Sequence, residues 1–102
     1  METDRFFTFD QRLQIHIPDA PDPWDSYSRS EQAAILNEWE NHRGSIPDRI
    51  KKIEQEIEIH QEMLYEEENF EASCELNDHI CELASQINDL WIWYRTGVTV
   101  EA

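Results

Sequence analysis

The fold is decided by the stretch from Ile46 to Arg95, which reads IPDRIKKIEQEIEIHQEMLYEEENFEASCELNDHICELASQINDLWIWYR. In both halves, apolar residues recur at spacings of three and four, which place side chains on one face of an α-helix. The first set comprises Ile46, Ile50, Ile53, Ile57 and Leu64, with His60 where the next apolar residue is due. The second set comprises Leu76, Ile80, Leu83, Ile87, Leu90 and Tyr94. We therefore expect two long helices, at about 46–67 and 70–95.

Capping residues mark where these two helices begin. Ser45 can cap the first, and Pro47 is tolerated in its first turn. Asn69 is a favourable cap for the second. Because the connection between the helices is short, they must lie antiparallel. The sequence predicts a mainly α fold built on a long antiparallel helical hairpin at 45–96, with a C-terminal tail at 97–102.

The N-terminal segment, residues 1–29, is expected to be extended and rich in proline. Its apolar residues fall on alternate positions from Phe7 to Ile17, which suits a strand or a short β-hairpin that turns near Asp10 and Gln11. The three prolines at 18–23 interrupt any regular element, since proline lacks the amide donor and restricts the residue before it. This part is therefore predicted to lead into the helices as a linker.

A short helix is predicted at 30–43, between the linker and the hairpin. Ser28 or Ser30 can cap its first turn, and Gly44 is suited to end it. We expect it to pack with the hairpin in a single domain that spans 1–102. Its inward face is predicted to consist of Ile35, Leu36 and Trp39.

Charge is the second dominant feature. Between Lys52 and Arg95 there is no Lys or Arg but there are twelve carboxylates, and the chain has a formal net charge of −15. Such a charge repels DNA, RNA and anionic membranes, so a charge-driven partner should present a basic protein surface. The carboxylates expected to bind it form two rows. The first row is Glu54, Glu58 and Glu62, and the second row is Glu68, Glu71, Glu75, Asp78 and Glu82.

The end of the second long helix, Leu90–Tyr94, is apolar on all sides, whereas a helical hairpin covers only one stripe. One interpretation is that the helix at 30–43 packs around this end together with Phe6, Phe7 and Phe9. The alternative is an exposed patch, including Trp91 and Trp93, that binds a partner or a second copy of the chain in a homodimer.

The cysteines indicate a reducing compartment. Cys74 and Cys81 are seven residues apart on a predicted helix, which separates their Cα atoms by roughly 10 Å. That separation is too large for a disulfide. We interpret both as free thiols that serve as small core residues. The sequence also has no apolar segment at the N-terminus and no run of about 20 apolar residues. Together with the free thiols, these features favour a cytoplasmic location.

Glu and His at helical spacing are candidate metal ligands. Glu56 with His60, and Glu75 with His79, are i,i+4 pairs, but helical bundles place such ligands in the core. Only His60 falls within the apolar stripe, where we interpret it as a polar residue that sets the helix register. The cysteines lack the basic setting that activates a thiol. We expect no metal, no cofactor and no enzymatic activity.

The residues around the hairpin turn resemble the UVR motif, an antiparallel helical hairpin found in bacterial nucleotide-excision-repair subunits and in some stress-response adaptors. The resemblance covers about 53–87 and is carried by Phe70, Glu71, Leu76, Asp78, Ile80 and Leu83. Ser73 fills a position at which that family has a small residue, and Asn77 stands where it usually has an arginine. The resemblance implies a docking module.

Two functions are therefore expected from the sequence. The first is a non-enzymatic adaptor or regulator that docks on a basic protein surface through the helical hairpin. The alternative is a nucleic-acid mimic of the kind made by phages and mobile elements, whose rows of carboxylates occupy the binding channel of a DNA- or RNA-binding enzyme. Both rest on the size of the chain, its charge and its long stretch without Lys or Arg.

Overall fold

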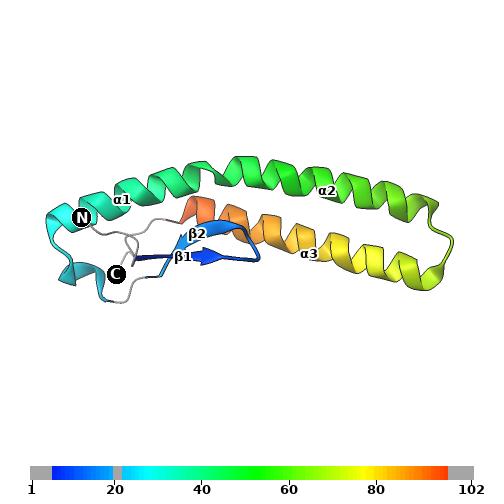
Figure 1. Cartoon of the computed structure of the whole chain (residues 1–102), viewed down its shortest axis with the longest axis horizontal. Coiled ribbons are helices and arrows are strands. Elements are labelled where there is room, and N and C mark those ends of the chain that lie inside the picture. Colours follow the sequence, from blue (N-terminus) through cyan, green and yellow to red (C-terminus); the bar gives the residue numbers. More distant parts are fainter. Residues whose placement is uncertain (1–5, 20–21, 97–102) are drawn as a thin grey trace.

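The computed structural model describes residues 6–19 and 22–96. Its elements are β1 (Phe7–Asp10), β2 (Ile15–Pro18), the 3-10 helix η2 (Trp24–Ser26), α1 (Arg29–Gly44), α2 (Ile46–Glu66) and α3 (Phe70–Arg95). Figure 1 shows an elongated molecule in which α3 lies antiparallel to α2 and the β-hairpin lies at the end remote from their turn. Its extents are 59 × 23 × 20 Å. The predicted mainly α fold and its antiparallel helical hairpin are confirmed. The predicted C-terminal tail, 97–102, lies outside the described residues.

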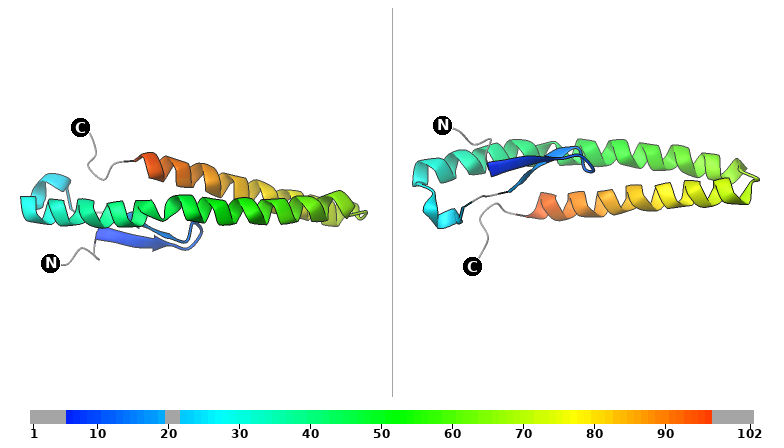
Figure 2. Two further views of the ribbon diagram at one scale, coloured as in Figure 1. Left: turned by 90° about the horizontal axis from the view of Figure 1, so that it is seen from above. Right: turned by 60° about the horizontal axis from the view of Figure 1, so that its bottom comes forward.

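The helix expected at 30–43 is present, but it runs on into α2 instead of ending at Gly44 as a separate element. Ser45, the one residue between α1 and α2, keeps helical dihedral angles of φ −86° and ψ −10°. Its carbonyl accepts a hydrogen bond from the Arg49 amide at 3.1 Å. Glycine stops a helix sharply when it adopts a positive φ, and Gly44 does not. The chain therefore continues in the same direction, and α1 and α2 form a rod of 38 residues (Figure 2).

Two of the three predicted helix caps are confirmed. Ser28 and Glu31 form a reciprocal capping box at the start of α1, with N···O distances of 3.1 and 2.8 Å. The side chain of Asn69 accepts a hydrogen bond from the Ala72 amide at 2.9 Å at the start of α3. The prediction that Ser45 caps α2 is wrong. Its hydroxyl donates to a carbonyl of the preceding turn at 2.7 Å, because the continuing rod leaves no open helix end for it.

The N-terminal residues form a β-hairpin, which is one of the two structures that their alternation predicts. β1 and β2 pair antiparallel, with Asp10 opposite Ile15. In the turn between them the Asp10 carboxylate accepts a hydrogen bond from the Leu13 amide at 2.8 Å. Gln14 adopts a positive φ of 61°, which reverses the chain direction. These contacts hold residues 11–14 as an ordered tip.

The core lies at the base of the helical pair, where the β-hairpin adds a third layer. One buried cluster joins the β-hairpin to α2 and α3 and consists of Leu13, Ile15, Ile46, Ile50, Ile53, Leu83 and Leu90. The second joins the β-hairpin to α1 and consists of Phe6, Phe7, Ile35 and Trp39. Half-buried Trp93 contacts both clusters. Toward the turn, the apolar stripe is only half-buried at Ile57, Leu64, Leu76 and Ile80. We call this two-layered part, residues 57–80, the distal arm.

Three expectations about buried side chains need correction. Leu36 is 38% exposed and Phe9 is 41% exposed. Leu36 lies on a side of α1 that the aromatic cluster does not cover. Phe9 contacts the ring of His16 on the paired strand, with centroids 5.0 Å apart, but lies outside both buried clusters. Cys74 and Cys81 are free, as predicted, but they are exposed instead of serving as core residues. They belong to the outer face of α3, which no third layer covers.

Candidate protein-interaction surface

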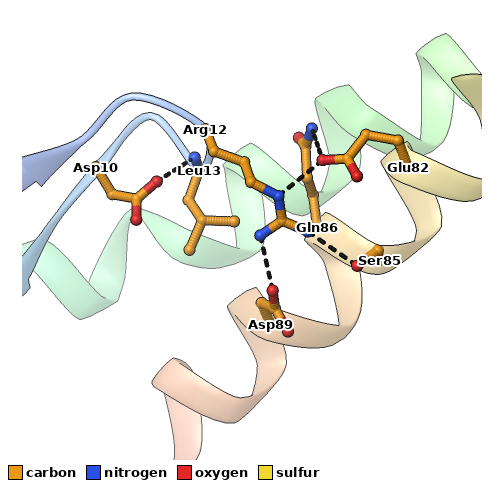
Figure 3. A network of polar contacts seen from close by, with 7 residues as sticks. All are labelled: Asp10, Arg12, Leu13, Glu82, Ser85, Gln86 and Asp89. Carbon is orange, nitrogen blue, oxygen red and sulfur yellow. Dashed lines mark hydrogen bonds and ion pairs between the residues drawn. The ribbon is translucent and has the colours of Figure 1, made fainter.

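The tip of the β-hairpin presents Arg12 to α3, as Figure 3 shows. The guanidinium Nε lies 2.7 Å from Glu82 Oε2, and Nη1 lies 2.7 Å from Asp89 Oδ2. Its third nitrogen, Nη2, donates to Ser85 Oγ at 2.9 Å. Among the described residues, Arg12 is the only Arg or Lys that forms an ion pair. One arginine therefore joins three positions on a single face of α3.

Local structure places Arg12 there. Leu13 is 2% exposed in the core, and its carbonyl accepts a hydrogen bond from Arg49 Nε of α2 at 3.1 Å. The hydrogen bonds with Asp89 and Glu82 raise the pKa of Arg12, and the bond with Arg12 lowers the pKa of Glu82. Because the Arg12 and Glu82 side chains are 38% and 49% exposed, solvent screens their attraction. The pair thus orients the tip more than it stabilises the fold.

The two predicted acidic rows lie on exposed helix surface. Every residue of both rows is exposed. Only Glu82 is in an ion pair with another described residue, so the second row is neutralised at its end nearest the core. The remaining members lie along α2, the turn and α3, and Glu68 belongs to the turn. Like charges at i,i+4 on a helix repel by a few tenths of a kcal/mol per pair, and the described structure offers these no cation in contact.

The distal arm also exposes large apolar side chains. Phe70 is 79% exposed and Tyr65 is 91% exposed beside the turn, while Ile59 and Met63 are about half exposed along α2. These residues contribute little to the core, because no third layer reaches them. Aromatic and methionine side chains are enriched in protein interfaces. The arm therefore combines uncovered apolar groups with unpaired carboxylates.

One groove of the distal arm lies between α2 and α3. It is lined by His60, Met63, Glu67, Ala72, Glu75, Leu76 and His79. The rings of His60 and His79 are in contact, with centroids 4.4 Å apart, and His60 Nδ1 donates to the Glu56 carbonyl at 2.7 Å. In the part of the chain that the structure describes, no three His, Cys, Asp or Glu side chains are grouped to hold a metal ion. The groove lining thus combines apolar and aromatic side chains with two carboxylates, Glu67 just after α2 and Glu75 on α3.

At the aromatic end of α3, some side chains pack inside the molecule and others are exposed. Trp93 is half-buried against Trp39, with ring centroids 6.0 Å apart, and serves the internal core. Trp91 and Tyr94 are 38% and 37% exposed and pack edge to face. The guanidinium of Arg43 lies 5.9 Å from the centre of the Tyr94 ring. An exposed apolar patch therefore remains here, but Trp93 is not part of it.

Sequence reasoning missed Arg12 and the exposed apolar residues of the arm. The signal for Arg12 was present, because Glu82, Ser85 and Asp89 have the i, i+3, i+7 spacing of one helix face. These partners lie 70, 73 and 77 residues from Arg12 in the sequence, and no periodicity connects them with it. The exposure of Tyr65 and Phe70 depends on how far the β-hairpin reaches, which the sequence pattern does not state.

Comparison with family models, with curated proteins and with solved structures finds no match to this chain. The resemblance to the UVR motif therefore stays a prediction from the residues at the turn. Within the described residues, no helix is long and apolar enough to cross a membrane.

Proposed function

We propose that this protein is a non-enzymatic binding module, an adaptor or a regulator, that docks on a basic protein surface through the α2–α3 hairpin. The β-hairpin and α1 form the base that holds the two helices together, and the distal arm extends from it. Most of the UVR-like residues lie on this arm, in keeping with a docking role, whereas Leu83 lies in the core. The interaction is expected to be fast and sensitive to salt, since long-range attraction would steer the partner to the arm.

One observation carries this proposal. Of the twelve carboxylates in the stretch without Lys or Arg, only Glu82 and Asp89 form ion pairs with described residues. The others are held on ordered helices or at their turn, where mutual repulsion lowers stability. A basic partner relieves that repulsion on binding, and the exposed aromatic residues of the arm supply contact area.

Affinity capture from a nuclease-treated cell extract tests the proposal. The bait is compared with a variant in which Glu54, Glu58, Glu62, Glu71, Glu75 and Asp78 are changed to Gln or Asn. We expect the wild-type chain to retain basic proteins that are released at about 0.5 M salt, where screening acts within a few ångströms. The variant should retain none of them while keeping the same helix content by circular dichroism.

A control variant separates the effect of the carboxylates on α2 and α3 from the effect of the net charge of the protein. Asp22→Asn, Asp25→Asn and Glu40→Gln remove charges from exposed positions at the other end of the molecule, and this variant should still retain the partner. If the wild-type chain and the arm variant retain the same proteins, or if salt has no effect, the proposal is wrong.

The nucleic-acid mimic is the second candidate. It is favoured by the placement of the carboxylates along α2 and α3 of a molecule 59 Å long, a shape suited to a binding channel. The two candidates differ in what displaces the partner. Duplex DNA or RNA should compete with this protein for a captured partner if the chain is a mimic, and should have no effect if it is an adaptor.

A further inference from the structure

The β-hairpin shows how this helical pair binds an extended segment. Two neighbouring residues of its tip make the contact: Leu13 enters the core, while Arg12 lies over the carboxylates of α3. The arginine fork reaches two carboxylates and a hydroxyl at once, a geometry that the point charge of a lysine does not provide. The covered part of this face ends at Glu82.

The same face continues uncovered into the distal arm. His79 and Glu75 precede Glu82 by three and seven residues on α3, so they follow it along one side of the helix toward the turn. They line the groove between α2 and α3, together with Met63 and Leu76. The groove is therefore the continuation of the surface on which the β-hairpin lies.

The spacing of the polar groups also repeats. Arg12 binds Glu82, Ser85 and Asp89, which stand at i, i+3 and i+7. One heptad nearer the turn, Glu75 and Asp78 take the places of Glu82 and Ser85, while the place of Asp89 is taken by Glu82, which is already paired with Arg12. No described residue forms an ion pair with Glu75 or Asp78. A second arginine, beside an apolar side chain that fills the groove, would meet the same kind of surface.

We propose that this groove binds an arginine-bearing extended segment of a basic partner protein, with an apolar side chain against Met63 and Leu76. The adjacent arginine lies over Glu75, which lines the groove, and over Asp78, an exposed residue outside the groove lining. The inference rests on the proposed docking function and adds to it the site and the chemistry of the ligand. A second copy of the chain is disfavoured as the occupant, because each copy has a net charge of −15 and like charges repel across an interface.

A labelled synthetic peptide in which arginine and leucine alternate is a direct probe, and the same peptide with lysine is its counterpart. Affinities are measured by fluorescence anisotropy for the full chain. We expect the arginine peptide to bind more tightly than the lysine peptide. Glu75→Gln with Asp78→Asn should weaken binding of the arginine peptide by about tenfold, because charge-assisted hydrogen bonds are lost.

A matched variant, Asp25→Asn with Glu40→Gln, removes the same charge from exposed positions at the other end of the molecule. It should change the affinity by less than about twofold, the level expected of distant screened charges. Met63→Ser, at a residue 51% exposed, should weaken binding without loss of folding, which circular dichroism checks. Addition of the arginine peptide should also shift the ring proton signals of His60 and His79 in NMR spectra.

The outcomes separate this inference from the function on which it rests. If both charge variants weaken the binding of both peptides equally, the attraction is unspecific and the groove proposal is wrong. Salt-sensitive capture of a basic protein would still support docking in that case. If the extract yields no partner that depends on the arm, the proposed function fails, whatever the peptides do. A dimer of the wild-type chain that Met63→Ser abolishes would show that a second copy occupies the groove and would overturn the proposal.

Discussion

At the scale of single residues, polar contacts at the base orient the β-hairpin against α1 and α3. Arg12 links the β-hairpin to α3, and His42 of α1 lies beneath the two strands. The ring of His42 stacks on His16 of β2 with centroids 4.8 Å apart, and its edge contacts Phe7 of β1. Its Nε2 lies 2.9 Å from the Glu38 carboxylate. Each of these residues joins elements that are distant in sequence, so each offers a test of the tertiary fold.

Arg12→Gln should lower the thermal midpoint of unfolding by a few degrees at low salt, because Glu82 and Asp89 lose the cation with which they are paired. The difference should shrink at high salt, since the pair is exposed and screened. Lys51→Gln removes a charge from an exposed residue of α2 and serves as the control. Equal effects of the two variants would show that Arg12 acts only through net charge.

Acidification should destabilise the fold through His42. Burial, and to a smaller degree the neighbouring His16, lowers the pKa of His42, although the Glu38 carboxylate acts in the opposite direction. The folded state thus favours the neutral ring. Stability is complete above the ordinary histidine pKa of about 6.5 and declines as the pH falls through the lower folded-state pKa. In urea titrations, His42→Gln should lose less stability between neutral and mildly acidic pH than the wild-type chain. Identical pH profiles would contradict this assignment.

At the scale of elements, the helices follow from local pattern and capping. The apolar spacing located α2 and α3, and the side chains of Ser28 and Asn69 start α1 and α3 as their residue types predict. The relation between α1 and α2 did not follow, because a glycine and a proline close together indicate a break. The break is confined to Ser45, since neither Gly44 nor its neighbours adopt the left-handed conformation that turns a chain.

Gly44→Ala tests this continuity. No heavy atom lies within 4 Å of the position that a Cβ would occupy, and the residue has no positive φ. Alanine should therefore stabilise the protein by about 0.5–1 kcal/mol, because it loses less backbone entropy than glycine in a helix. Chemical denaturation measures the change. A loss of stability would mean that the chain turns at this residue.

At the scale of the whole molecule, the core and the interaction surface occupy opposite ends. Buried apolar residues stop at Ile53 on α2 and Leu83 on α3, the point that the β-hairpin tip reaches. Beyond it, the distal arm consists of only two layers, α2 and α3. It carries half-buried apolar residues and unpaired carboxylates. This division explains why part of the apolar stripe stays exposed in an otherwise regular helical pair. It also places the proposed binding surface where a partner can approach from several sides.

The sequence by itself determined the helices, their antiparallel pairing and the long run of negative charge, because periodicity, capping and charge are local properties that short segments carry. It also identified the two acidic rows, but it did not show that Arg12 neutralises the end of one. Tertiary structure alone decided that contact, the continuation of α1 into α2, and the limit of the core at Ile53 and Leu83. The reason is that each depends on how far one segment reaches along another that is distant in sequence.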